Sequence, residues 1–110
     1  MKIIDSYAYS RPGIKIAEHD LSGMIGDVQL AIASDKDIRS WRVLLSRIDM
    51  AALSALSKLF DKASSVNHLV VEQRDRAKSR DPSFSGQVTL SRMSSTRVRL
   101  SGIGPVRILP

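Results

Sequence analysis

The residues in this chain with the clearest chemical potential are basic side chains in the last third of the sequence. Residues 74–110 carry eight Lys or Arg and two acidic residues, a net charge of +6 that equals the net charge of the whole chain. Seven of the eight are arginines, whose forked guanidinium groups match phosphate or carboxylate oxygens. A charge concentrated in one segment makes a directed field, so the pattern predicts an anionic partner.

Two segments hold these basic residues. Residues 74–86 are charged, contain Pro and Gly and have no apolar periodicity, so we expect a mobile basic loop there. Further on, Arg97 and Arg99 alternate with apolar residues, which is typical of the polar face of a strand. Together the segments predict an anion-binding or nucleic-acid-binding surface made of Arg74, Arg76, Lys78, Arg80, Arg92, Arg97 and Arg99.

Nucleic-acid backbone is the favoured partner, because a basic two-stranded ribbon can enter a groove and a basic arm can follow phosphates. Two alternatives stay open: the surface only keeps the protein hydrated, or it docks on an acidic protein, as an inhibitor, adaptor or assembly factor would. The chain has five aromatic residues, so backbone contact is favoured over base stacking. Phe84, in the basic loop, is the residue that could stack on a base.

The sequence offers little for catalysis or metal binding. Cysteine is absent, which excludes disulfides, thiolate zinc sites and cysteine nucleophiles. His19, which has acidic neighbours, and His68 are the two histidines, and neither stands in a known catalytic motif. We therefore expect a protein that is not an enzyme, with no catalytic residue, no metal site and no cofactor.

Length and composition predict one globular domain over residues 1–110, since 43% of the residues are hydrophobic and 25% are charged. No apolar run reaches the roughly 18 residues that a membrane helix needs, and residues 1–6 do not resemble a signal peptide. We expect a cytoplasmic protein with no membrane association. A homodimer is possible, because two-fold dimers are the commonest assemblies.

A helix over residues 50–64 is the clearest predicted element, because Leu53, Leu56 and Phe60 recur on one helical face. Asp49 is expected to cap its first turn. Residues 38–48 match a strand before this helix and also match the first part of one long helix over residues 36–64. A cap at Asp49 favours the strand.

Alternating apolar and polar residues predict strands at both ends of the sequence. Residues 2–18 are expected to form one hairpin, and residues 88–100 another with a loop at 93–95. In that second hairpin Leu90 pairs with Val98.

These elements predict an α+β fold: a mostly antiparallel sheet with one principal helix, at about residues 50–64, packed on one face. The predicted core contains Ile3, Val28, Leu30, Ile32, Trp41, Leu53, Leu56, Phe60, Val70, Val88, Leu90, Val98 and Leu100.

Overall fold

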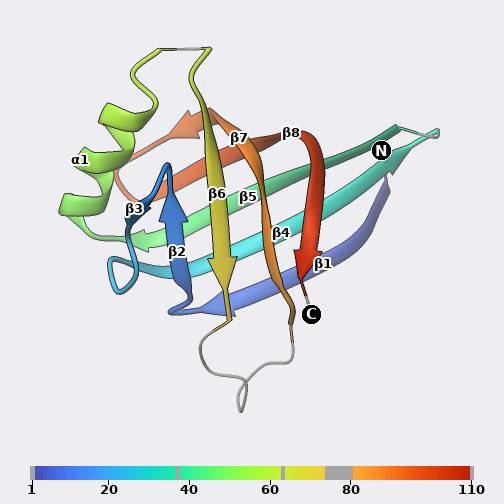
Figure 1. Cartoon of the computed structure of the whole chain (residues 1–110), viewed down its shortest axis with the longest axis horizontal. Helices are drawn as coiled ribbons and strands as arrows, with labels where there is room; N and C mark the ends of the chain where they lie inside the picture. Colours follow the sequence, from blue (N-terminus) through green and yellow to red (C-terminus); the bar gives the residue numbers. More distant parts are fainter. Residues whose placement is uncertain (1, 37, 63, 74–80, 110) are drawn as a thin grey trace.

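The computed structural model describes residues 2–36, 38–62, 64–73 and 81–109, which form a sheet and a helix (Figure 1). No helix in these ranges is long and apolar enough to span a bilayer. The elements are β1 (Lys2–Ser10), β2 (Gly13–Ile16), β3 (His19–Asp20), β4 (Ile25–Asp35), β5 (Ile38–Ile48), α1 (Met50–Leu59), β6 (Val66–Glu72), β7 (Ser83–Met93) and β8 (Arg97–Leu109).

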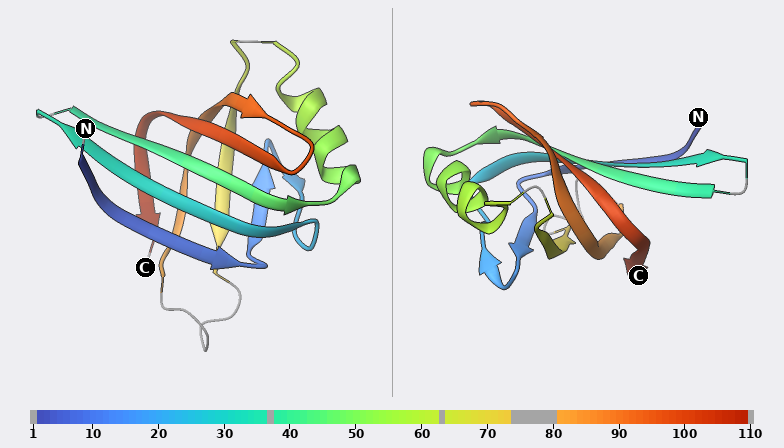
Figure 2. Two further views of the ribbon diagram at one scale, coloured as in Figure 1. Left: turned by 180° about the vertical axis from the view of Figure 1, so that it is seen from behind. Right: turned by 90° about the horizontal axis from the view of Figure 1, so that it is seen from above.

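The eight strands form one sheet in the order β1-β4-β5-β8-β7-β6-β2-β3. All its strand pairs are antiparallel, and α1 is the single helix of the described ranges, so the predicted mostly antiparallel sheet with one helix is confirmed. The sheet folds over on itself, and β1, β4 and β5 lie in one layer across from β2 and β6 in the other (Figure 2). The helix covers one end of the space between the layers (Figure 1).

The predicted hairpin over residues 2–18 is wrong. β1 pairs with β4, and β2 pairs with β6, so the two strands belong to different layers. The chain changes layer at Arg11, which has a positive φ of 47° and whose N–H donates to the carbonyl of Gly26 at 2.8 Å. Tyr9 and Ile14, on either side of this corner, are both buried. The free energy gained by burying both apolar segments in the core therefore exceeds that of pairing the two segments with each other.

The core lies between the two layers and contains most of the predicted residues. Buried as predicted are Val28, Leu30, Ile32, Trp41, Leu56, Phe60, Val88, Val98 and Leu100. Leu53 and Leu90 pack against the core while partly exposed. Val70 alternates with the fully buried Leu69 and Val71 and is partly exposed on the opposite face of β6, so its assignment to the core is wrong. Ile3 is 52% exposed, which corrects its assignment to the core. Its strand, β1, is the outermost strand on this side of the sheet, and β4 is its one neighbour within the described part of the chain.

Phe84 belongs to the core and not to a basic loop. β7 begins at Ser83, so the last residues of the predicted loop 74–86 form a strand. The Phe84 side chain is fully buried, and its ring centroid lies 5.6 Å from that of Tyr9 and 6.4 Å from that of Trp41. It is therefore unavailable for stacking on a base.

Trp41 packs β5 against the bend of β8 through two glycines. A Cβ atom at Gly102 would lie 2.1 Å from the Trp41 ring, and one at Gly86 would lie 2.5 Å from it. Only glycine leaves room for the indole at these positions. The indole Nε1 donates to the carbonyl of Gly104 at 2.9 Å. This contact lies next to the stretch in which β5 pairs with β8.

The helix ends earlier than predicted. α1 covers Met50–Leu59, because Phe60 leaves the helical conformation and its ring is buried. Asn67 Nδ2 donates to the free carbonyl of Leu59 at 2.8 Å. Asp49 occupies the N-cap position, but its carboxylate makes no cap hydrogen bond. Residues 38–48 form strand β5, which confirms the strand interpretation.

Candidate anion-binding site

Three of the predicted site residues lie around one hollow of the surface. Arg92, Arg97 and Arg99 line a pocket of about 230 Å³ together with Leu44 and Ser94. We call these five residues the arginine pocket. The pocket is built by three adjacent strands, β5, β8 and β7, and by the turn that joins β7 to β8.

Strand alternation places two of the arginines. Val98 and Leu100 on β8 are fully buried, so they define the inner face of the sheet, which contacts the core. Arg97 and Arg99 alternate with them and are exposed on the opposite, outer face. This part of the site follows from the period of two that the sequence shows.

The pairing of β7 with β8 differs from the prediction by two residues. Leu90 lies opposite Leu100 and not Val98, and Val88 lies opposite Gly102. The turn begins after Met93, which pairs with Val98, and this moves the pairing by three residues. An extra residue in β7 between Leu90 and Arg92 reduces the shift to two.

Ser94 closes this turn and so fixes the backbone at the end of the arginine pocket where Arg97 lies. Its N–H donates to the carbonyl of Arg97 at 2.8 Å. Its Oγ accepts the N–H of Arg97 at 3.1 Å and lies 3.4 Å from the N–H of Thr96. A serine side chain that binds the backbone in this way stabilises a tight turn. The first pocket residue of β8, Arg97, is therefore held at the end of the hairpin.

A β-bulge brings Arg92 to the same face. Leu90 lies opposite Leu100 and Arg92 lies opposite Arg99, so Ser91 is an extra residue in β7. In a regular strand Arg92 would share the inner face with Leu90. The bulge shifts the alternation by one residue and turns Arg92 outward, beside Arg99.

The floor of the pocket comes from β5. Leu44 lies opposite Arg99, and it is half-buried on the outer face. Arg42 lies two residues before Leu44 on the same strand, opposite Ser101, and its exposed side chain adds a basic group beside the pocket. Sequence reasoning missed Leu44 and Arg42, because it could not identify which strand borders β8.

The arginine pocket has an uncompensated positive charge. Arg92 and Arg99 are directly opposite each other, which sets their Cβ atoms about 5 Å apart, and like charges in this position destabilise a sheet. Within the described ranges no carboxylate forms an ion pair with Arg92, Arg97 or Arg99. The arrangement can therefore donate several guanidinium N–H groups to one anion, whose binding would relieve the repulsion.

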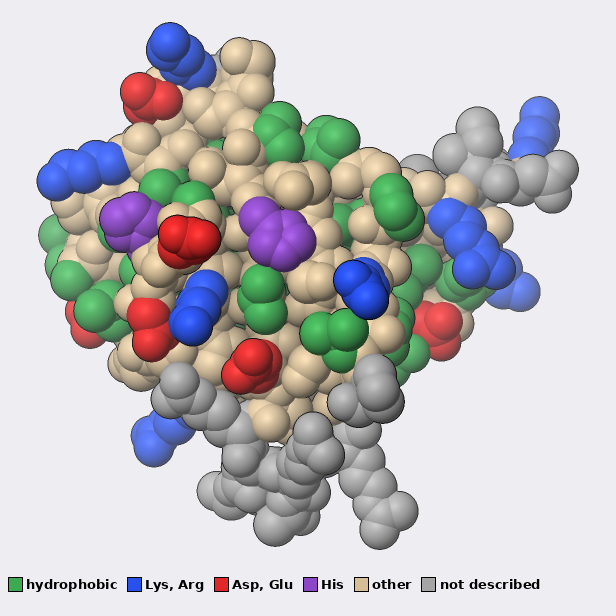
Figure 3. Space-filling model, in the orientation of Figure 1, with side chains coloured by type: hydrophobic (Ala, Val, Ile, Leu, Met, Phe, Trp, Pro, Cys, Tyr) green, Lys and Arg blue, Asp and Glu red, His purple; other side chains and the backbone are tan. Residues whose placement is uncertain are grey.

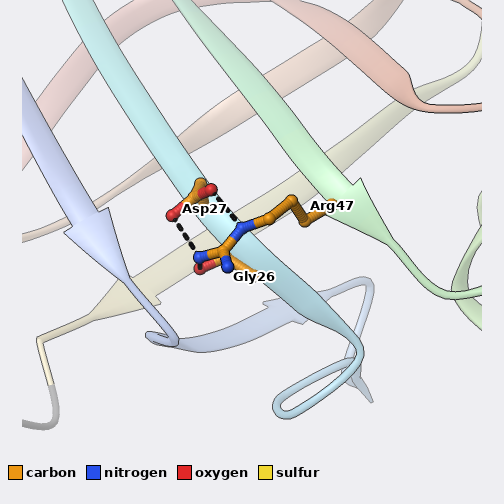
Figure 4. Close-up of polar contacts among 3 residues, drawn as sticks. All are labelled: Gly26, Asp27 and Arg47. Atoms are coloured by element: carbon orange, nitrogen blue, oxygen red, sulfur yellow. Dashed lines mark hydrogen bonds and ion pairs between the residues drawn. The ribbon is translucent and has the colours of Figure 1, made fainter.

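Asp27 lies on the outer face of β4, but Arg47 holds it (Figure 4). Arg47 Nε lies 2.5 Å from Asp27 Oδ2, and Nη2 lies 2.8 Å from Oδ1. The hydrogen bonds from Arg47 lower the pKa of the Asp27 carboxyl below its usual value. This carboxylate is already satisfied, so it does not serve as a counterion for the arginine pocket.

The two histidines lie on a face of mixed charge. His19 and His68 are exposed, and His68 Nδ1 lies 3.3 Å from Gln87 Nε2. Basic, acidic and histidine side chains are mixed on the face over β2 and β6 (Figure 3). Among the residues with described positions, no three His, Asp or Glu side chains are grouped so that they could hold a metal ion.

The other four predicted site residues, Arg74, Arg76, Lys78 and Arg80, lie outside the described residues. Their part in the site stays a prediction. The chain matches no protein-family model, no curated protein and no solved structure.

Proposed function

We propose that this protein binds the phosphate backbone of nucleic acid at the arginine pocket and acts as a binding protein without catalysing a reaction. The observation that carries the proposal is the pairing of Arg92 directly opposite Arg99, with Arg97 beside them and no carboxylate of the described chain paired to any of the three. A bound anion would relieve this repulsion by accepting hydrogen bonds from the guanidinium groups.

Nucleic acid supplies the charge density that this cluster requires. Duplex DNA carries one negative charge per about 1.7 Å of helix axis, and arginine binds phosphate oxygens in pairs. An acidic protein would have to bring several mutually repelling carboxylates into the same 230 Å³. Phe84, Tyr9 and Trp41 are buried, so these rings are not available for base stacking and the proposal is restricted to the backbone.

The test is a salt titration of binding to labelled duplex DNA, duplex RNA and single strands, measured by fluorescence anisotropy between about 50 and 200 mM salt. We expect the logarithm of affinity to fall linearly with the logarithm of salt concentration. Arg92→Gln and Arg99→Gln should each reduce the slope by about 1, since each removes one phosphate contact. Arg107→Gln is the matched control, because Arg107 is an exposed arginine of β8 outside the pocket.

Three results would overturn the proposal: binding that does not change with salt, no binding to any nucleic acid, or an equal loss in the Arg107→Gln control. Polyglutamate is the probe for an acidic protein partner. Binding of polyglutamate as tight as that of duplex, lost in the two pocket variants, would reject nucleic acid in favour of a protein-docking module. A cytoplasmic location is compatible with the absence of cysteine and stays a prediction.

A further inference from the structure

One edge of the sheet ends in a long strand with exposed apolar side chains. β1 is the outermost strand on that side, and among the described strands it pairs with β4 alone. Figure 2 shows that part of β1 and the β4–β5 hairpin extend past the rest of the molecule. Ile3 is 52% exposed and Ile4 is 41% exposed on this projection. An open edge of this length is a template for pairing with another strand.

The open part of the edge has a defined end. The N–H of Ala8 points away from β4 and donates to Asp81 Oδ2 at 3.0 Å. Next to it the Tyr9 hydroxyl donates to the carbonyl of Pro82 at 2.5 Å. Burial, followed by the nearby Asp81, raises the pKa of Tyr9, which keeps this phenol a neutral donor. These contacts cover β1 from Ala8 onward, so residues 2–6 are the segment that can accept a new neighbour.

A β-bulge places Lys2 and Asp5 on the same face of this segment. The register of β1 on β4 shifts between Ile3 and Asp5, which leaves Ile4 as an extra residue. Lys2 and Asp5 are three positions apart, so in a regular strand their side chains would point to opposite faces. The bulge resets the alternation, and both side chains are exposed on one face.

We propose that a second copy of this chain pairs with residues 2–5 of β1, antiparallel, about a two-fold axis perpendicular to the sheet. Lys2 then lies opposite Asp5 of the partner subunit, and Ile3 and Ile4 of both subunits lie between the two Lys–Asp pairs. The contact contains two Lys–Asp pairs with the exposed isoleucines between them, and it joins the two sheets into one.

Symmetry selects this register. A two-fold axis perpendicular to the sheet keeps the same face of both subunits on one side of the joined sheet. Two residues that lie directly opposite each other across the contact must therefore share a face. Lys2 and Asp5 share a face because of the bulge. A shift of one residue would set Asp5 opposite the partner's Ile3, and these two side chains lie on opposite faces of β1. The same shift would also leave each aspartate without a lysine.

The test is the mass of the protein in solution, measured by sedimentation velocity over a range of protein concentrations. We expect a dimer for the unmodified chain. Lys2→Glu and Asp5→Lys each place like charges at both polar contacts, and each should weaken dimerisation at least about tenfold. An equimolar mixture of the two single variants should form a heterodimer, because both polar contacts are again between opposite charges. The double variant should also dimerise.

Two further variants separate pairing from a loss of folding. Ser6→Pro places a ring next to Asp5 on the side that faces the partner strand, because the N–H of Ser6 points away from β4 by alternation with Ala8, and it should weaken the dimer while circular dichroism stays unchanged. Lys36→Glu changes a charge at the tip of the same projection and should leave the dimer intact. A monomer at every concentration, or no recovery in the mixture and the double variant, would overturn the proposal. Either result would leave the proposed binding of nucleic acid unaffected.

Discussion

At the scale of single residues, arginine has two contrasting environments on this sheet. Arg47 is paired with a carboxylate through two hydrogen bonds, whereas Arg92 faces another arginine. Arg47 also adopts a positive φ of 51° opposite Gly26, where an added Cβ atom would lie 2.9 Å from that of Arg47. Glycine at position 26 thus leaves room for the Arg47 side chain that pairs with Asp27.

The Asp27–Arg47 pair predicts a pH dependence of stability. Arg47 lowers the pKa of Asp27 in the folded protein, so the pair contributes stability above the ordinary aspartate pKa of about 3.9. This contribution is lost as the pH falls through the lowered pKa. Asp27→Asn should therefore reduce the free energy of unfolding modestly at pH 7, because both side chains are partly exposed. Urea denaturation would show the difference between variant and parent shrinking as the pH is lowered below about 4. A difference that is the same at low pH and at pH 7 would contradict this assignment.

At the scale of elements, the β7–β8 hairpin carries the site, and its bulge decides the composition of the pocket. Ser91 is inserted so that Arg92 faces Arg99, while Met93 returns to the inner face opposite Val98. Bulges commonly redirect a side chain at a functional position. Here the bulge sets two positive charges opposite each other, where a regular strand would point Arg92 at the core.

This repulsion predicts that removing one arginine stabilises the hairpin. Arg92→Gln and Arg99→Gln should each raise the free energy of unfolding by about 0.2 to 1 kcal/mol at low salt. The double variant should gain less than the sum of the two, because the repulsion can be removed only once. Urea denaturation of the four proteins measures this coupling, which should weaken at high salt. Arg107→Gln serves as the control, and an equal gain there would show that net charge and not the opposed pair is responsible.

At the scale of the whole molecule, the two proposals combine. A subunit measures 38 × 37 × 22 Å, and the arginine pocket lies on its outer face. In a dimer with its axis perpendicular to the sheet, the outer faces of both subunits lie on the same side. One polyanion could then reach two arginine pockets.

A bivalent dimer predicts a dependence on duplex length. A duplex of about 40 base pairs extends about 140 Å, several times the length of one subunit, whereas one of about 10 base pairs extends about 34 Å. The unmodified chain should prefer the longer duplex by at least about a hundredfold. Lys2→Glu should lose most of this preference and keep its affinity for the short duplex. An equal preference in both proteins would mean that the pockets act one at a time.

The comparison of sequence with structure separates local from non-local information. The strand at residues 38–48, the position of the helix and nine of the core residues followed from apolar periodicity, because burial acts on each side chain within its own element. The hairpin over residues 2–18 did not form, because the partners of β1 and β2 lie far away in the sequence. A pattern of period two identifies a strand without identifying its neighbour.

The candidate site divides in the same way. The sequence by itself determined that the positive charge is concentrated in residues 74–110, and that Arg97 and Arg99 share one exposed face, since alternation is a property of the strand alone. Only the tertiary structure decided that Arg92 joins them and that Leu44 forms the floor. Bulges and strand order arise from packing between distant segments, and that packing sets which side chains meet at a surface.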